Sequence, residues 1–468
     1  MATILKSNGT FKGSQSALPS SNAPLPPGAA LFADFSGSRH VMQFASGQVL
    51  RSSTLTDVLS FTRLSTATRV GEGGLIEYLA ENEPAIDYDP ITHKCLGIRT
   101  ETGVNNRLAY SQDFTQAASW TQSGISLVAN DVAAPDGNTT ATKLIEAASG
   151  SASPHTLLAI TTSAAVVSQP YTFSVWAKAN TGSVLQLAAQ GAVATTQFVN
   201  FDLNNGKVGK GSPQVLQATM EPYANGWYRC AITITPTSAA SPAFTLALTN
   251  SDSSANALPS YVPVTVGSVW IWGAQAERRD GASSYIPTNG AESLRSDEIC
   301  TTPTNANFIS ANSGTVLMTC VHPHSIQSIS GQYNSLACAV VLDNSVAGAH
   351  LRLAYRETTN NNGQAQWATS DAAGVSQSLE IYSLSPIRDS EQAAIFSYDK
   401  STMTLKLFDG YNWYSRVVTS MPDALNRLCV GRSYIGPNNW FNGHTKRVVY
   451  WPTALSTAEM ERAISYLA

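Results

Sequence analysis

Short strand-like segments separated by turn residues are the feature that most limits how this chain can fold. In the segment Tyr171–Lys178 (YTFSVWAK), Tyr171, Phe173 and every second residue after them lie on one face of a strand. The same alternation places Trp176 on the opposite, more polar face. Tight-turn signals, such as Asn204–Gly206, separate such segments. The pattern predicts an all-β fold of β-sandwich or jelly-roll domains.

The length of 468 residues predicts two or three domains, because one hydrophobic core usually organises about 100–200 residues. We expect four successive parts: an extended arm at 1–30, a small region at 31–104, a β-sandwich at 105–298 and a second β-sandwich at 299–468. The acidic run Glu81–Asp89 is predicted to be an extended loop, and Pro287–Glu298 a linker. A short C-terminal helix is predicted at Ser456–Leu467, where Ser456 and Glu459 have capping-box spacing.

Composition and charge exclude several classes of function. Only 13% of the residues are charged and the net charge is −4, so we expect no binding to nucleic acid or to anionic membranes. The N-terminus lacks the pattern of a signal peptide, and no segment has the length of an apolar membrane span. The six cysteines are widely spaced and are interpreted as small buried hydrophobic residues, although the sequence leaves one oxidised pair open.

Four segments carry a family resemblance. They are Ser60–Thr68 (SFTRLSTAT, followed by Gly74–Ile76), Asn225–Cys230 (NGWYRC), Trp270–Glu277 with Ser284–Gly290, and Phe441–Arg447 (FNGHTKR). In this order the segments resemble bacteriophage tail and fibre appendage proteins, from about residue 30 to the end. The resemblance implies a clamp at 31–104, a carbohydrate-binding-module-like sandwich at 105–298 and a laminin-G/concanavalin-A-like sandwich at 299–468.

The resemblance also implies a role and partners. We expect a structural virion protein of the tail, baseplate or fibre apparatus, made in the host cytoplasm, that presents its sandwiches to host-surface glycans. Residues 1–30 would attach it to other virion proteins by adding a strand, or else form a disordered tail. A trimer is the favoured assembly. A capsid or neck decoration protein without a ligand and a polysaccharide depolymerase are the alternatives.

Loops rich in aromatic and amide side chains in the second sandwich are the candidate glycan site. Sugar rings stack on aromatic faces, and their hydroxyls need polar partners such as asparagine. The candidate residues are Tyr411, Asn412, Trp413, Tyr414, Tyr434, Asn438, Asn439 and Trp440. In the first sandwich, Trp176, Trp227, Trp270 and Trp272 are similar candidates, with packing as the favoured interpretation.

Catalysis and metal binding have weaker support. Paired carboxylates would be needed for glycoside hydrolysis, but the acidic residues, including Asp87 and Glu298, are interpreted as solvated loop and linker residues. The sequence therefore predicts that the protein is not an enzyme and needs no cofactor. Cys320, His322 and His324 occupy every second position, so on a strand their side chains would lie on one face and could bind a metal. No fourth ligand is evident, and we predict no metal site. Calcium binding is left open.

Overall fold

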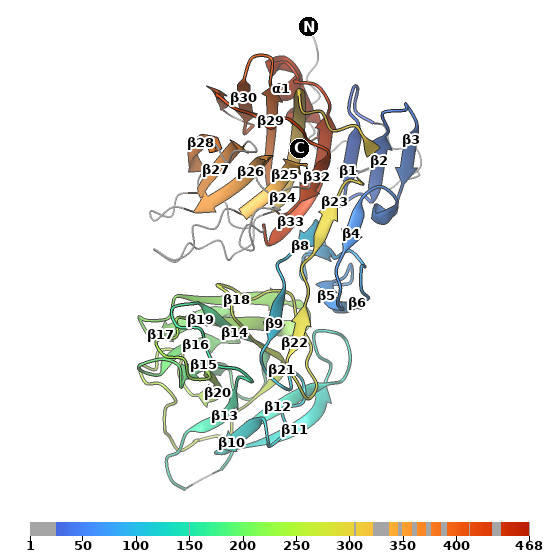
Figure 1. Cartoon of the computed structure of the whole chain (residues 1–468). Helices are drawn as coiled ribbons and strands as arrows, with labels where there is room; N and C mark the ends of the chain where they lie inside the picture. The colour runs from blue at the N-terminus through green and yellow to red at the C-terminus, as the bar shows by residue number, and fades with distance from the viewer. Residues whose placement is uncertain are drawn as a thin grey trace.

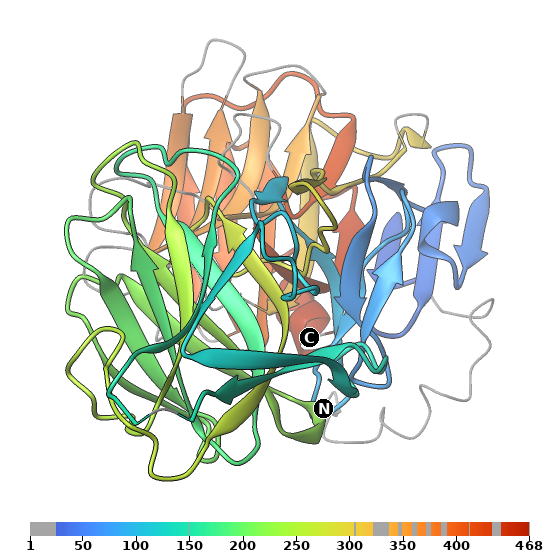
Figure 2. The same cartoon turned by 90° about the horizontal axis from the view of Figure 1, so that it is seen from below.

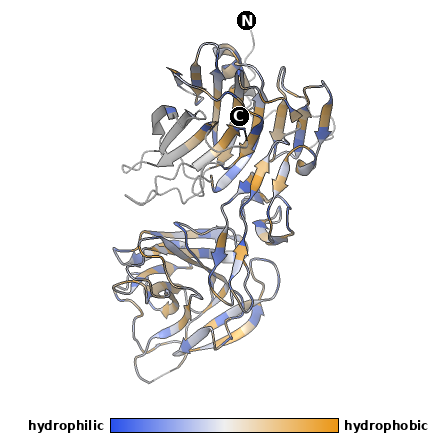
Figure 3. Ribbon diagram, in the orientation of Figure 1, coloured by the Kyte–Doolittle hydropathy of each residue, from blue (hydrophilic) through white to orange (hydrophobic). Residues whose placement is uncertain are grey.

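The computed structural model consists of two β-sandwiches joined by two extended segments (Figure 1). It describes residues 25–148, 150–303, 306–321, 337–344, 349–357, 363–370, 376–384, 391–410, 412–432 and 441–467. The predicted all-β fold with a short C-terminal helix is confirmed. Apolar residues concentrate on the strands of both sandwiches (Figure 3).

The first sandwich consists of two six-stranded sheets. One sheet has the order β10 (Trp120–Ser123), β13 (His155–Ile160), β20 (Ala243–Thr249), β15 (Val184–Gln190), β16 (Gln197–Asp202) and β17 (Lys207–Gly211). The other has the order β11 (Ile125–Val132), β12 (Ala141–Glu146), β21 (Ser268–Glu277), β14 (Tyr171–Ala179), β19 (Trp227–Ile234) and β18 (Gln217–Tyr223). The predicted inward face of β14, which includes Tyr171 and Phe173, is fully buried in the core between these sheets.

The second sandwich pairs a ten-stranded sheet with a seven-stranded sheet. The larger sheet follows the order β3 (Val49–Ser52), β2 (Arg39–Gln43), β1 (Leu31–Asp34), β33 (Gly443–Trp451), β24 (Ser313–Val321), β29 (Glu391–Asp399), β30 (Thr404–Phe408) and β31 (Trp413–Val417), with β8 (Cys95–Thr100) on β33 and β7 (Ile86–Tyr88) on β8. The smaller follows β28 (Ser376–Leu384), β27 (Gly363–Ser370), β26 (His350–Glu357), β25 (Ala337–Asp343), β32 (Arg427–Val430), β23 (Ile299–Thr301) and β4 (Ser60–Thr62).

N-terminal strands are therefore part of both sheets of the second sandwich. Strand β1 pairs antiparallel with β33, with Leu31 opposite Tyr450, and β4 pairs with β23, with Ile299 opposite Thr62. The blue N-terminal strands lie beside the red C-terminal strands in both views (Figures 1 and 2). The sequence assigns residues 31–104 to a small clamp region, and in the structure most of their strands extend the sheets of the C-terminal sandwich.

The C-terminal helix α1 (Thr457–Leu467) covers the outer face of the ten-stranded sheet. Its Met460 and Ile464 are buried against Leu317 and Val449 of that sheet. The predicted capping box is confirmed, because the backbone N–H and hydroxyl of Ser456 both donate to Glu459 Oε2, at 2.8 and 2.6 Å. Among the described residues, no helix is long and apolar enough to span a membrane.

Among the described residues, two small sheets and two short 3-10 turns complete the fold. The turns are Leu55–Asp57 and Ala224–Gly226. Strands β9 (Val104–Asn106) and β22 (Ser293–Arg295) pair in the connection between the sandwiches, and β5 (Ala67–Val70) and β6 (Ile76–Leu79) form a hairpin. Strand β7 lies within the run 81–89, which the sequence predicts to be an extended loop, and β22 lies within the predicted linker.

Candidate functional site: a pocket between the two sandwiches

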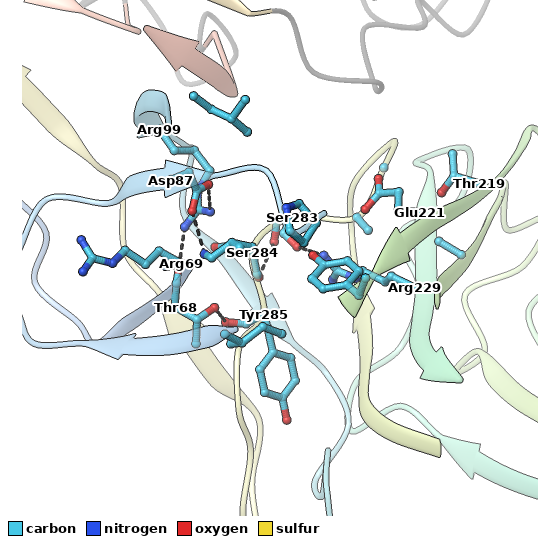
Figure 4. Close-up of a pocket in the computed structure, with 18 of the residues that line it drawn as sticks. Thr68, Arg69, Asp87, Arg99, Thr219, Glu221, Arg229, Ser283, Ser284 and Tyr285 are labelled. Carbon is cyan, nitrogen blue, oxygen red and sulfur yellow. Dashed lines mark hydrogen bonds and ion pairs between the residues drawn. The ribbon is translucent and has the colours of Figure 1, made fainter. Parts of the chain in front are cut away.

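A pocket of about 500 Å³ lies where the two sandwiches face each other. Its walls come from the β5–β6 hairpin, from β7 and β8, from the outer face of β18 and β19, and from the segment 279–285 that follows β21. The C-terminal sandwich contributes residues near the ends of β24 and β33, including His444. Figure 4 shows Arg99 and Glu221 on opposite sides of this pocket, with Ser283 and Ser284 between them. The site therefore combines residues that are far apart in the sequence.

An aromatic cluster supports the side of the pocket formed by the first sandwich. The Trp176 ring packs edge-on against Tyr223, Trp272 and Tyr285, with ring centroids 5.4–5.5 Å apart. Gly273 allows this close packing, because its φ is +65° and a Cβ there would lie 2.8 Å from Trp176 Cε3. Trp176 does lie on the face of β14 opposite Tyr171, but that face is not a polar surface, since Trp176 is only 1% exposed.

The β5–β6 hairpin covers this aromatic cluster. Ile76 is buried in the same cluster, and its N–H donates to the carbonyl of Pro135 at 2.9 Å. The Thr68 hydroxyl donates to the carbonyl of Tyr285 at 2.7 Å (Figure 4). The hairpin therefore fixes the segment 282–285 at the wall of the pocket.

Buried ion pairs form the wall nearest the connection between the sandwiches. Asp87 accepts hydrogen bonds from Arg99, from His444 Nε2 at 2.8 Å and from the Val70 N–H at 2.8 Å. Burial acts to raise the pKa of Asp87, but Arg99 and His444 outweigh it and hold that pKa below its ordinary value. Asp87 is 4% exposed, so the interpretation of this residue as a solvated loop carboxylate is wrong.

Glu101 is a second buried carboxylate beside the pocket. Its Oε2 lies 3.0 Å from Arg99 Nε and 3.5 Å from Arg295 Nη2. Its Oε1 accepts a hydrogen bond from the Ser284 N–H at 3.1 Å and lies 3.9 Å from Arg279 Nη1. Although burial opposes it, the positive charge of these arginines lowers the pKa of Glu101. The carboxylate thus stays ionised and holds its arginines in place.

A further ion pair lies behind the pocket wall. Arg63 Nη1 and Glu298 Oε1 are 2.9 Å apart, and neither side chain is exposed. Glu298 Oε2 also accepts the Glu101 N–H at 3.0 Å. The sequence-based interpretation of Glu298 as a solvated linker residue is therefore wrong as well.

Two arginines from the first sandwich line the pocket without full hydrogen bonding. Arg229 lies over the Trp176 ring at 4.4 Å and donates to the carbonyl of Ser283 at 2.7 Å and to Ser174 Oγ at 3.1 Å. Its Nε has no hydrogen-bond partner among the described residues, and neither do Nε and Nη1 of Arg279 or the hydroxyl of Ser284. The arrangement is suited to bind a ligand that supplies hydrogen-bond acceptors.

The predicted glycan site of the second sandwich is described only in part. Tyr411, Tyr434, Asn438, Asn439 and Trp440 lie outside the described residues. The remaining three are placed on or next to strand β31, at the edge of the ten-stranded sheet.

These three residues do not form one surface. The Trp413 ring stacks on Phe408 at 4.7 Å, and its Nε1–H donates to Glu461 of α1 at 2.8 Å. Tyr414 packs against the inner core instead, on the other face of the sheet. The Asn412 N–H donates to Asp409 Oδ1 at 2.6 Å. A role of these residues in glycan binding stays a prediction.

The other candidate tryptophans pack within the first sandwich. Trp227 is 1% exposed, and its Nε1–H donates to the carbonyl of Ala133 at 3.3 Å. Trp270 and Trp272 share a face and pack into the aromatic cluster, as predicted. The partly buried Trp270 donates to Asp131 at 2.7 Å. The packing interpretation is confirmed for these residues.

Most of the described cysteines lie in the core, and of the three residues considered as metal ligands only Cys320 is described. Cys230, Cys300, Cys320 and Cys429 are buried, as predicted, and Cys95 is half-buried. Cys95, Cys230, Cys300 and Cys429 form no disulfide with one another. Cys320 lies in the core, while His322 and His324 lie outside the described residues. Within the described ranges, no group of three or more His, Cys, Asp or Glu side chains could hold a metal ion.

Sequence reasoning missed the residues that line this pocket, chiefly Arg99, Glu101, Arg229, Arg279 and Ser284. A usable signal was present at Arg229 and Arg99, because each is a charged residue within an otherwise apolar strand of a chain that has few charges. Buried arginines of this kind need partners or ligands. The pairing of the elements that carry them is a long-range property, so the sequence alone did not bring them together.

Comparisons with known proteins reveal likenesses of structure only. No protein-family model matches the sequence, and no curated protein matches it. The CBM40 of a Ruminococcus gnavus IT-sialidase, bound to α2,6-sialyllactose, is 12% identical with a TM-score of 0.28, covering 34% of this chain and 87% of that one. The NanB sialidase of Streptococcus pneumoniae is 16% identical with a TM-score of 0.26, covering 34% and 25%. An enzymatically active domain of bacteriophage CBA120 tailspike protein 4 is 15% identical with a TM-score of 0.23, covering 37% and 21%.

These matches correct one prediction. The sequence predicts that the protein is not an enzyme, but the matched structures include sialidases and the enzymatically active domain of a tailspike. The exclusion of enzyme activity is therefore wrong as it was stated. All three TM-scores are well below 0.5, so no activity or ligand is carried from these proteins to this chain.

Proposed function

We propose that this protein is a structural component of a bacteriophage virion and binds host-surface glycans in the pocket between its two sandwiches. The resemblance of its sequence segments to tail and fibre appendage proteins supports the virion role. The make-up of the pocket supports glycan binding.

The observation that carries this proposal is the mixture of aromatic rings and converging polar groups in one pocket. Its volume of about 500 Å³ lies within the usual range for small-molecule sites. Tyr88 and Tyr223 offer rings on which a sugar could stack, and Thr219 and Glu221 offer partners for its hydroxyls. Both tyrosines line the pocket and are half-buried.

The rest of the proposed role concerns assembly. Residues 1–30 would attach the protein to other virion proteins, and a trimer is the assembly that we favour. In the virion, the protein would be located in the tail, baseplate or fibre rather than in the capsid or neck. The laminin-G/concanavalin-A-like character of the C-terminal sandwich also belongs to this proposal.

A glycan panel tests the proposal directly. The full-length protein is applied to immobilised bacterial surface polysaccharides, and binding and reducing-end release are measured together. We expect Tyr223→Ala to weaken binding at least about tenfold. Trp413→Ala, an aromatic truncation in the other predicted site, is the matched control and should bind as well as the parent protein.

The outcomes separate the alternatives. Release of oligosaccharide would identify a depolymerase. Loss of binding in Trp413→Ala alone would move the site to the edge of the ten-stranded sheet. If the protein bound none of the polysaccharides in the panel, the result would contradict glycan recognition and favour a decoration protein.

A further inference from the structure

Several buried hydrogen-bond donors of the pocket between the sandwiches have no partner among the described residues. Arg279 is 9% exposed and Arg229 is 5% exposed, yet Arg279 Nε and Nη1 and Arg229 Nε have no hydrogen-bond partner among the described residues. The same holds for the buried hydroxyl of Ser284. A buried donor without a partner lowers stability, so a cluster of them needs an explanation.

The buried carboxylates of the pocket already face donors, although Glu101 Oε2 is held by ion pairs rather than by a hydrogen bond. Both oxygens of Asp87 accept hydrogen bonds. Oε1 of Glu101 accepts the Ser284 N–H, and Oε2 lies within 3.0 Å of Arg99 Nε and 3.5 Å of Arg295 Nη2. At the edge of the pocket, Asp89 accepts the N–H groups of Ile91 and Thr92. A ligand that satisfied the remaining buried groups would have to bring acceptors.

We propose that the glycan bound in this pocket carries an oxyanion, namely a carboxylate, sulfate or phosphate group, which binds beside Arg279 and Ser284. This inference rests on the proposed glycan-binding function and names the class of sugar. A guanidinium group presents its N–H donors in a planar fork that matches two oxygens of an oxyanion. A neutral hydroxyl offers one oxygen and brings its own donor, so it satisfies such a fork less well.

The backbone and side-chain anchors around these groups keep them in position. The Thr172 hydroxyl donates to the Arg279 carbonyl at 2.9 Å. Arg229 is fixed by Trp176 and by the Ser283 carbonyl, as described above. Glu221, on β18, is half-buried across the pocket from Arg99, where it would face the neutral part of the sugar (Figure 4).

Matched glycan pairs test the inference. The full-length protein is titrated with oligosaccharides of identical linkage that differ in one group: uronate against its carboxyl-reduced form, sulfated against desulfated, and phosphorylated against dephosphorylated. We expect the acidic member of at least one pair to bind at least about tenfold more tightly. The pair that shows the difference identifies which oxyanion is the ligand.

Variants connect this preference to the pocket. Arg279→Gln should remove the preference for the acidic member, reducing its affinity about 10- to 100-fold and leaving the neutral member unchanged. The matched control is Arg51→Gln, which makes the same charge change at an exposed position on β3. It should retain the preference.

Thermal unfolding separates a binding role from a structural one. Arg279 has no hydrogen bonds through Nε or Nη1, and Glu101 keeps Arg99 and Arg295 without it. Arg279 is the most distant of the three arginines around Glu101, at 3.9 Å, so Arg279→Met should lower the unfolding temperature only slightly while losing the acidic preference. A large drop in unfolding temperature would show a structural arginine and overturn the inference.

Different results would contradict the oxyanion inference and the proposed glycan binding. Equal affinity for both members of every pair would overturn the oxyanion inference and leave glycan binding intact. A parent protein that bound no member of any pair would overturn the proposed function and this inference together. Retention of the acidic preference in Arg279→Gln would show that the oxyanion binds elsewhere.

Discussion

Arg63 and Glu298 are 235 positions apart in the sequence and form an ion pair with no solvent exposure. Both charges have lost their hydration, so each depends on the other and on nearby backbone groups. Arg63 Nη2 also donates to the Ala80 carbonyl at 2.7 Å, and its Nε donates to the Ser65 carbonyl at 3.0 Å. At the residue scale, such groups link the region between β4 and β6 to the connection between the sandwiches.

Removing one partner of this pair should be costly. Arg63→Met leaves the Glu298 carboxylate buried beside fewer positive charges, and we expect it to lower the free energy of unfolding by about 3–5 kcal/mol. The double variant Arg63→Met/Glu298→Gln removes the unpaired charge and should recover a large part of that loss. Urea unfolding of the two variants checks this, and an equal loss in both would contradict the account.

A buried histidine gives a pH dependence. His40 is 2% exposed, and burial lowers its pKa to about 4, although Asp34 and Asp57 act to raise it. Below the unfolded value of 6.5 the unfolded chain binds a proton that the folded protein does not bind. The contribution to stability is therefore complete above that pH and is lost as the pH falls toward about 4, by up to about 3 kcal/mol. Between pH 7 and pH 4, the free energy of unfolding of His40→Gln should fall less than that of the parent protein.

At the element scale, helix α1 shields one face of the ten-stranded sheet. Its apolar residues Met460 and Ile464 face the sheet, while Glu461 reaches the Trp413 ring nitrogen. The sequence predicted this helix within one residue at its start, because a capping box is a local signal. The same is true of the inward face of β14, whose alternation is visible in eight consecutive residues of Tyr171–Lys178.

The helix cap has a measurable contribution. Ser456→Ala removes the hydroxyl that donates to Glu459 and accepts its N–H, at 2.6 and 3.4 Å, and should lower the free energy of unfolding by about 1 kcal/mol. Ser456→Asp retains an acceptor for the N–H group and should lose less. Equal losses in both variants, measured by chemical denaturation, would show that the cap does not act through this hydrogen bond.

At the scale of the whole molecule, the two sandwiches differ in how they are assembled. The first is built only from β10–β21, which are contiguous in the chain. The second needs β1, β4 and β8 from the N-terminal region beside strands from the C-terminal region. The pocket lies between them, so its shape depends on the contacts that fix the connection.

This difference predicts how fragments behave. A fragment of residues 105–292 should fold alone, because it contains both six-stranded sheets and their core. A fragment of residues 299–468 should not fold alone, because β33 would lose its partners β1 and β8. Circular dichroism and thermal unfolding of the purified fragments check this. Cooperative unfolding of the C-terminal fragment would contradict the sheet order described here.

The fold class could be predicted from the sequence, but most of the site could not. Strand alternation and turn residues are local, so they predicted sandwiches and the burial of Tyr171 and Phe173. Trp176 was placed on the correct face, yet the hairpin that covers it comes from residues about a hundred positions earlier. The sequence predicted that Asp87 and Glu298 are solvated, because their arginine partners lie in other segments of the chain.

A crystal structure of the full-length protein with the tightest-binding oligosaccharide of the panel would locate the sugar. We expect the sugar to lie between the sandwiches, with a ring against Tyr88 or Tyr223 and an acidic group beside Arg279. A sugar bound instead at the edge of the ten-stranded sheet, near Trp413, would contradict this expectation.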